Sequence, residues 1–285
     1  MVNLDSLAAL DLVLWLGTTE RAAALAHSNQ STVSRRSRTV LQTFQLRLAR
    51  SRDGWMPRGN TSLLALERRV HQRARFLGKQ PLRLQVPCWS HPRALRHLPE
   101  GWCANPQQSG WVCENPVGLL RDRVIDACLI TPTQLPWPTE DLLLLDLYRR
   151  PIELTVFDGG LSDAHQPSDL PARTAGPLHL RLLPFLPRSC RDRSREWFDA
   201  LHGSAQAEGP SAGGVCRSIS GHDPVSVAFL TPEMREAQER PWFVEAGLEP
   251  YPYVERLAVL VENAGQPAIQ RLQEHLLEQF APLAA

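Results

Sequence analysis

Apolar residues recur along the N-terminal part of the chain at the three- and four-residue spacing of helices, with short polar breaks between the repeats. Residues 4–14 carry a leucine at every third or fourth position, which predicts a first helix. Residues 21–27 are rich in alanine and favour a second helix. Ser28-Asn29 then prefer a turn, and residues 30–44 again carry an apolar face of helical spacing. The pattern predicts two helices joined by a tight polar turn, with a supporting helix before them.

The polar face of the third predicted helix carries side chains that suit the edges of DNA bases. Gln and Arg pair bidentately with adenine and guanine, while Ser and Thr reach bases or phosphates. In a helix-turn-helix, such residues lie near the start of the second helix of the pair, where they meet base edges. The alternative is an ordinary solvated helix face. The DNA-contact candidates are Thr18, Asn29, Gln30, Ser31, Thr32, Ser34, Arg35 and Arg38.

Residues 50–59 predict a basic hairpin, because Asp53-Gly54 favours a tight turn between two short strands. Such a hairpin, or wing, would offer arginines to the phosphates of the DNA backbone. An ordinary basic loop is the alternative. The wing candidates are Arg50, Arg52 and Arg58.

A longer helix is expected from about residue 61 to residue 77. Leu63 and Leu66 begin a narrow apolar stripe, which is typical of a helix that pairs with a partner helix. Packing against its own domain is the alternative. Gly78 and Pro81 then end the helix and mark a domain boundary. The other faces of this helix carry Arg68, Arg69, Arg73 and Arg75.

Beyond residue 81, strand-like and helix-like segments alternate, which predicts an α/β fold. The strand-like segments are 82–86, 124–130, 142–147, 152–157, 178–183, 225–230 and 257–261. The helix-like segments are 117–123, 193–202 and 266–280.

Ligands of α/β sheets bind beyond the carboxyl ends of strands, where loops present free N–H groups and hydroxyls. Helix N-termini at such loops favour anions, so a carboxylate metabolite is the expected kind of ligand. For each loop residue taken alone, a solvated position without ligand contact is the alternative. The effector-contact candidates are Trp89, Ser90, His91, Thr131, Ser220 and His222.

Charge is divided unevenly along the chain. Residues 1–80 hold 13 basic and 5 acidic side chains, a net charge of +8, whereas the remaining 18 basic and 25 acidic side chains give −7. A basic head on an acidic body is expected when only one end contacts a polyanion. No run of apolar residues is long enough to span a membrane, and Asp5 and Asp11 argue against a signal peptide, so a cytoplasmic protein without membrane contact is expected.

The six cysteines show neither Cys-x-x-Cys nor zinc-finger spacing with His, so structural roles are favoured and no metal is expected. A redox-sensing pair, Cys103/Cys113 or Cys190/Cys216, is the alternative. The sequence contains no G-x-S-x-G, Walker, H-E-x-x-H or G-x-G-x-x-G motif. We therefore expect neither an enzyme nor a cofactor.

The helix-turn-helix segment resembles the N-terminal winged helix-turn-helix of LysR-type transcriptional regulators, a bacterial family, over roughly residues 2–80. The resemblance rests on Gly17-Thr18, Ala22-Ala23, Leu25, Gln30 and Val33-Ser34-Arg35, and on Leu46, Leu48 and Gly59 around the wing. The sequence departs from the family pattern at Ser37 (an apolar core position), Gln45 (a turn glycine), and Ala49 and Ser51 (Phe and Arg of the wing strand). Residues 119–127 and 225–232 loosely resemble the effector-binding part of these regulators.

The resemblance implies three parts: a winged helix-turn-helix at 1–59, a linker and dimerisation helix at 60–80, and an α/β effector-binding domain at 81–285. The last would consist of two Rossmann-like subdomains, as in periplasmic binding proteins, at about 82–150 with 264–285 and at about 151–263. A homodimer or homotetramer would bind double-stranded promoter DNA under the control of a small-molecule effector. The alternatives are a ligand-binding or interaction protein with degraded operator recognition, and a cysteine-based redox-responsive regulator.

Overall fold

A computed structural model of the chain describes most of its first 157 residues and its C-terminal end. The described residues are 2–51, 54–87, 90, 94–95, 97–105, 113, 115–131, 135, 138–157, 180–182, 225–230, 242–244 and 251–284. They fall into two compact units, Met1–Tyr148 with Val254–Ala285 and Arg149–Tyr253.

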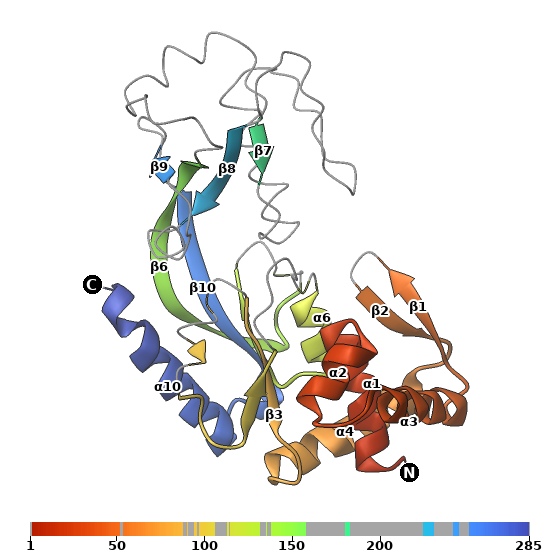
Figure 1. The fold of residues 1–285 in the computed structure, drawn as a ribbon. Helices are drawn as coiled ribbons and strands as arrows, with labels where there is room; N and C mark the ends of the chain where they lie inside the picture. The colour runs from red at the N-terminus through yellow and green to blue at the C-terminus, as the bar shows by residue number, and fades with distance from the viewer. Residues whose placement is uncertain are drawn as a thin grey trace, which may run out of the picture. The chain divides into compact units, whose positions relative to one another are not determined.

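The N-terminal part of the first unit, here called the head, consists of four helices and a two-stranded hairpin (Figure 1). Its elements are α1 (Leu4–Leu16), α2 (Thr19–Leu25), α3 (Gln30–Thr43), β1 (Arg47–Ser51), β2 (Gly54–Arg58) and α4 (Ser62–Phe76). The predicted helices, the turn at Ser28-Asn29 and the hairpin are confirmed, but the chain reverses between Ser51 and Gly54 rather than at Asp53-Gly54. Ser51 pairs with Gly54 across the antiparallel hairpin, and Gly54 adopts a positive φ of 114°, which glycine accommodates without a steric penalty.

Helix α4 forms where it was predicted, but its polar face is buried and its apolar stripe is exposed. Arg68 and Arg75, which we expected on outer faces, are buried, whereas Leu63 and Leu66 are exposed. The alternative expectation was that this helix packs against its own domain. It holds for the face with Arg68 and Arg75, which is buried, but not for the face with Leu63 and Leu66. The reason is chemical: buried carboxylates elsewhere in the unit pair with the two guanidinium groups.

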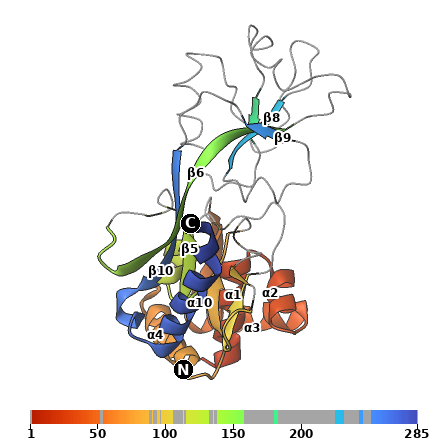
Figure 2. The ribbon, with the colours of Figure 1, turned by 90° about the vertical axis from the view of Figure 1, so that its left-hand side faces the viewer.

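The rest of the first unit, here called the α/β part, is a mixed sheet with helices on both faces (Figures 1 and 2). Strands β4, β3 and β5 are parallel neighbours, and β10 adds antiparallel to β5, with β6 beyond it. Its elements are β3 (Leu82–Gln85), β4 (Trp102–Ala104), α6 (Pro116–Arg121), β5 (Ala127–Ile130), the start of β6 (Leu142–Phe157), β10 (Tyr251–Leu260), η3 (Val261–Asn263) and α10 (Pro267–Ala284).

The two faces of this sheet contribute to different parts of the core. Cys128 and Ile130 of β5 pack in the cluster that contains α1 and α6, whereas Leu129, between them, is buried outside that cluster. This alternation is the two-residue period of a strand. Helix α10 covers the other face, where the ring of Phe280 stacks on that of Tyr148 with centroids 5.3 Å apart.

In the second unit, the later half of β6 pairs antiparallel with β8 (Val225–Leu230) and β9 (Trp242–Val244), and β7 (Leu180–Leu182) runs parallel to β8. Two separate strands were predicted at 142–147 and 152–157, and this prediction is wrong: β6 is continuous. The extended backbone of a strand accommodates the fixed φ of Pro151, so the chain need not bend there. The predicted helix at 193–202 lies outside the described residues.

Candidate nucleic-acid interface

Helix α3 has one face in the core and one face in solvent. Val33, Ser37 and Val40 are buried in the contact with α1. The opposite face is exposed and polar, while Thr32 and Ser34 are half-buried at its margin. The exposed candidates on or next to α3 are Asn29, Gln30, Ser31, Arg35 and Arg38.

The start of α3 is positioned by polar contacts with α2. Gln30 Nε2 donates a hydrogen bond to Thr19 Oγ1 at 2.8 Å, which joins the first residues of the two helices. Thr18 caps α2, because its hydroxyl accepts the backbone N–H of Arg21 at 3.2 Å. Asn29 stands at the N-cap of α3, but its side chain makes no capping hydrogen bond. Its amide group is therefore not committed to the helix end.

A hydrogen bond from a tryptophan of the hairpin connects the hairpin to the helix-turn-helix. Trp55 Nε1 donates to the backbone carbonyl of Gly17 at 3.1 Å. Arg50 and Arg58 are exposed, as expected, and so is Arg47, which the sequence reasoning missed. Arg47 pairs with Arg58 across the hairpin, a like-charge arrangement that an anion would relieve. A turn at Asp53-Gly54 would place Ala49 opposite Arg58, whereas the strands pair Ser51 with Gly54, so the predicted turn could not have revealed the position of Arg47.

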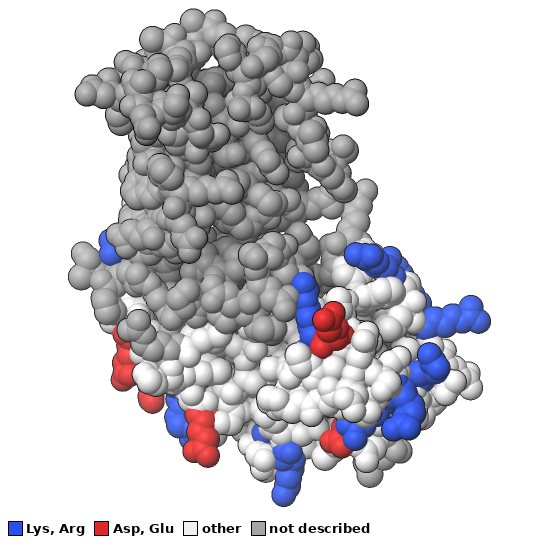
Figure 3. All heavy atoms as spheres, viewed as in Figure 1, with Lys and Arg blue, Asp and Glu red and all other residues white. Residues whose placement is uncertain are grey.

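Basic side chains gather over β1, β2 and α3 on the face seen in Figure 3. These three elements contain no acidic residue. Arg36 pairs with Asp5 in an exposed ion pair at 3.2 Å, so it is already partly neutralised. The surface formed by α3 and the hairpin therefore suits a polyanion. Its exposed arginines are Arg35, Arg38, Arg47, Arg50 and Arg58.

The two sequence departures in the helix-turn-helix core have local structural consequences. Ser37 is buried, and its hydroxyl has no hydrogen-bond partner among the described residues. Gln45 adopts a left-handed φ of 54°, a conformation that favours glycine. Gly59 has a positive φ of 128°, a conformation that residues with a Cβ atom rarely adopt, and a Cβ atom there would lie 2.9 Å from Leu46 Cδ2.

Two effector-contact candidates are described, and both follow parallel, neighbouring strands. Ser90 follows β3, is buried, and has a hydroxyl without a hydrogen-bond partner among the described residues. Thr131 follows β5 directly and is also buried. The remaining candidates, Arg52 of the hairpin and Trp89, His91, Ser220 and His222, lie outside the described residues.

The three described cysteines form no disulfide bond with one another: Cys103 and Cys113 are half-buried and Cys128 is buried. Burial raises the pKa of Cys103 to about 11, so its thiol is protonated at neutral pH. Within the described part of the chain, no group of three or more His, Cys, Asp or Glu side chains could hold a metal ion. None of the described helices combines the length and apolar character that a membrane crossing requires.

Neither a protein-family model nor a curated protein matches this chain. Among solved structures, ArgP from Mycobacterium tuberculosis has a TM-score of 0.50 at 14% identity, over 97% of this chain and 96% of that one. The chain has the fold of a LysR-type regulator. The predicted combination of a winged helix-turn-helix with an α/β body is thereby confirmed.

Two further solved structures are similar at lower scores. A full-length OxyR variant from Pseudomonas aeruginosa has a TM-score of 0.47 at 17% identity, over 98% of both chains. Full-length CbnR in complex with its target DNA has a TM-score of 0.48 at 15% identity, over 97% of this chain and 99% of that one.

Proposed function

We propose that this protein is a LysR-type transcriptional regulator that binds double-stranded promoter DNA and responds to a small-molecule effector. The observation that carries this proposal is the exposed face of α3, with Gln30, Arg35 and Arg38 beside the arginines of β1 and β2, three elements that contain no acidic residue. A helix with such a face fits the major groove, where Arg reads guanine and Gln reads adenine. The protein is not an enzyme in this proposal.

The hairpin acts as the wing. Arg47, Arg50 and Arg58 contact backbone phosphates, which sets the register of α3 in the groove without reading sequence. The Trp55–Gly17 hydrogen bond holds the wing at a fixed place beside the helix-turn-helix. Arg52 joins the same phosphate-contact group.

The effector binds at the carboxyl ends of β3 and β5. Ser90 supports this placement, because its buried hydroxyl lacks a partner among the described residues, and Thr131 follows the adjacent parallel strand. Trp89 and His91 belong to the same loop as Ser90, and Ser220 and His222 would contact the effector from a second loop. A carboxylate metabolite is the proposed class of ligand.

The exposed stripe of α4 pairs two copies of the chain. Leu63, Leu66, Val70 and Leu77 follow one another at intervals of three, four and seven residues and are all more than half exposed. This spacing is that of a helix pair. In the resulting division of labour, residues 1–59 bind DNA, 60–80 join the copies of a dimer or tetramer, and 81–285 form the two-subdomain effector domain.

The test is to capture genomic DNA with the purified full-length protein, sequence it, and measure affinity for a recovered fragment against salt. We expect one enriched sequence class and an affinity that falls steeply as salt increases, because counterions are released from the DNA. Steep salt dependence without sequence preference would support the alternative, a protein with degraded operator recognition. Absence of salt-dependent DNA binding would contradict the proposal.

A further inference from the structure

From Ala9 onward, helix α1 is buried on all sides, although the helix-turn-helix covers only one of them. Every residue from Ala9 to Leu16 is buried, including Asp11 and Trp15. One side packs on α3 within the head. The other side meets the α/β part of the same unit: Trp15 Nε1 donates to Gln85 Oε1 of β3 at 2.7 Å, in a buried hydrogen bond. A helix that is apolar on all its faces is stable when every face is covered by protein. Here the head covers one side of α1 and the α/β part covers the other.

The apolar core is continuous across the boundary between the head and the α/β part. A single cluster of buried residues contains Leu10 and Trp15 of α1, Leu64 of α4, and Leu120 and Ile125 of the α/β part. Separating the two parts would therefore expose apolar surface on both sides.

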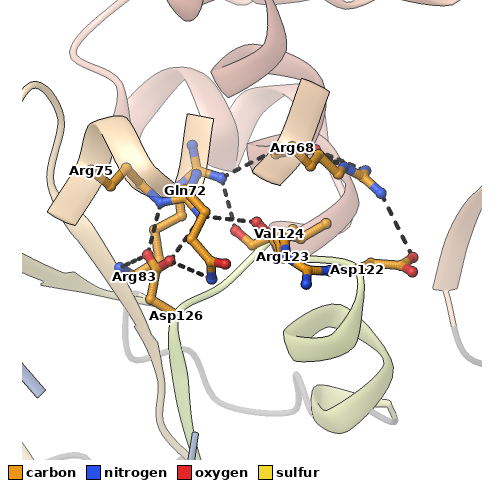
Figure 4. A network of polar contacts seen from close by, with 9 residues as sticks. Arg68, Gln72, Arg75, Arg83, Asp122, Arg123, Val124 and Asp126 are labelled. Carbon is orange, nitrogen blue, oxygen red and sulfur yellow. Dashed lines mark hydrogen bonds and ion pairs between the residues drawn. The ribbon is translucent and has the colours of Figure 1, made fainter. Parts of the chain in front are cut away.

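Asp126, just before β5, binds α4 through a saturated set of hydrogen bonds (Figure 4). Arg75 of α4 donates from Nε to Asp126 Oδ2 at 2.8 Å and from Nη2 to Oδ1 at 2.9 Å, and Nη2 also donates to the carbonyl of Arg123 at 2.8 Å. Gln72 Nε2 donates to Oδ1 at 3.1 Å, and the backbone N–H of Arg83 donates to Oδ2 at 2.9 Å. This bidentate pair is fully buried, which makes its geometry specific.

A second buried ion pair lies beside the first and adds α1 to the same network. Arg68 Nη2 lies 2.8 Å from Asp11 Oδ1, and its Nε donates to the same oxygen at 2.9 Å. Arg68 Nη1 also lies 3.7 Å from Asp122 Oδ2. From the α/β part, Arg83 Nη1 donates to the Val124 carbonyl at 2.8 Å and lies 3.7 Å from Asp11 Oδ2.

We infer that the head and the α/β part of the first unit form one rigid body, joined by a clasp and without a hinge between them. The clasp consists of Asp11, Arg68, Gln72, Arg75, Arg83 and Asp126, together with the Trp15–Gln85 hydrogen bond. Opening it would leave buried charges without partners, which is strongly unfavourable.

The connection between α4 and β3 is itself tied down. Only residues 77–81 link the two elements. The N–H of Lys79 donates to the carbonyl of Ala74 at 3.0 Å, and the N–H of Gly78 donates to that of Arg75 at 2.9 Å. At the other end, the N–H of Leu82 donates to the carbonyl of Gly101 at 2.8 Å. Residues 77–81 form a short linker whose backbone hydrogen bonds restrict it, so it is not expected to act as a flexible hinge.

The clasp leaves the DNA-contact surface free, because it uses α1 and one face of α4 but no residue of α3 or the hairpin. If the proposed function is right, Ser90 and Thr131, the two described effector-contact candidates, belong to the same rigid body as the recognition helix. An effector would then change the spacing of two recognition helices by moving whole bodies relative to each other within the oligomer. The head would then not swing relative to the α/β part of the first unit.

Native-state hydrogen exchange of the full-length protein, followed by mass spectrometry at increasing denaturant, tests the rigid body. We expect peptides from α1 and from β5 to open in one cooperative step with the same denaturant dependence. The variant Gln85→Met lies in the α/β part and removes the acceptor of Trp15. It should raise the opening of both peptides by the same factor, on the order of tenfold.

Asp126→Asn should act in the same way and more strongly, and Gln85→Met keeps the test decisive if Asp126→Asn does not fold. The matched control is Asp141→Asn, which breaks an exposed ion pair with Arg121 in the same unit and should change neither opening. Opening of α1 before β5, or an effect of Gln85→Met on β-strand peptides alone, would overturn the rigid body. The readout uses neither DNA nor effector, so that result would leave the proposed function standing.

Discussion

Arg35 and Arg38 lie nearly one turn apart on the exposed side of α3, and neither forms an ion pair with another described residue. Arg36, between them, is directed to Asp5, and Arg68 and Arg75 of α4 are buried. Arginines close in sequence thus have different surroundings, and their effects on DNA affinity should differ accordingly. Exposure without a partner is what makes a guanidinium group available to a base or phosphate.

Replacing Arg35 tests whether an exposed arginine of α3 contacts DNA. Arg35→Ala should weaken binding to a recovered operator by about 1–3 kcal/mol if the side chain pairs with a guanine edge. Binding to non-specific DNA should weaken less, because a base contact contributes mainly to discrimination. Fluorescence anisotropy with both DNAs gives the two affinities. Arg271→Ala, an exposed arginine on α10, is the matched control, and an equal effect of both variants would remove Arg35 from the reading surface.

Cys103 should be unreactive at neutral pH. Burial holds its pKa at about 11, so the thiolate that reacts with oxidants and alkylating agents is scarce. Labelling of Cys103 by iodoacetamide should be much slower in the folded protein than in the unfolded chain at pH 7.5, and should accelerate as the pH rises toward 11. Peptide mass spectrometry measures both rates. Rapid labelling, with a change of DNA affinity that Cys103→Ser abolishes, would favour the redox-responsive alternative.

At single residues, the sequence predicts exposure better than it predicts which distant residues pair. The exposed face of α3 could be predicted, because period and side-chain chemistry agree there. The burial of Arg68 could not, since its partner Asp11 is 57 positions away and a helical pattern does not reveal which face packs. The sequence placed Asp126 in the strand-like segment 124–130 but did not reveal that its carboxylate accepts hydrogen bonds from α4 and β3.

At the scale of elements, the two faces of α4 lie in different surroundings. The face with Arg68 and Arg75 joins the head to the α/β part, and the face with Leu63 and Leu66 is exposed. The sequence predicted the helix and its apolar stripe but not the use of its polar side. At β6, two strands were predicted at 142–147 and 152–157, although a single strand runs from Leu142 to Phe157.

A charge placed in the exposed stripe of α4 should break the proposed oligomer. Leu66→Glu removes a leucine that would contribute about 2 kcal/mol when buried between copies, and it adds charge repulsion. Sedimentation velocity should show a shift to a smaller species at micromolar concentration, with unchanged circular dichroism. Val261→Glu, a similarly exposed apolar position on η3, is the control. An unaltered assembly in Leu66→Glu would show that another surface joins the copies.

At the scale of the whole molecule, the clasp shows that part of the positive charge in residues 1–80 is buried and not available at the surface. The net charge of +8 in residues 1–80 includes Arg68 and Arg75, which are buried and paired with carboxylates. In the proposed function, the charge offered to DNA therefore comes from the exposed arginines of α3 and the hairpin rather than from the N-terminal part as a whole. Arg68 and Arg75 instead join the head to the α/β part of the first unit.

This interdependence predicts that the head does not fold by itself. A fragment of residues 1–80 would expose the second side of α1 to water and leave Asp11 and Trp15 without their contacts to the α/β part. We expect weak helical circular dichroism, no cooperative unfolding, and red-shifted fluorescence from the two tryptophans of the fragment, Trp15 and Trp55, whereas the full-length protein should show strong helical circular dichroism and cooperative unfolding. Cooperative melting of the fragment with native-like fluorescence would show that the helix-turn-helix is autonomous. The clasp would then join two independently stable domains instead of completing one.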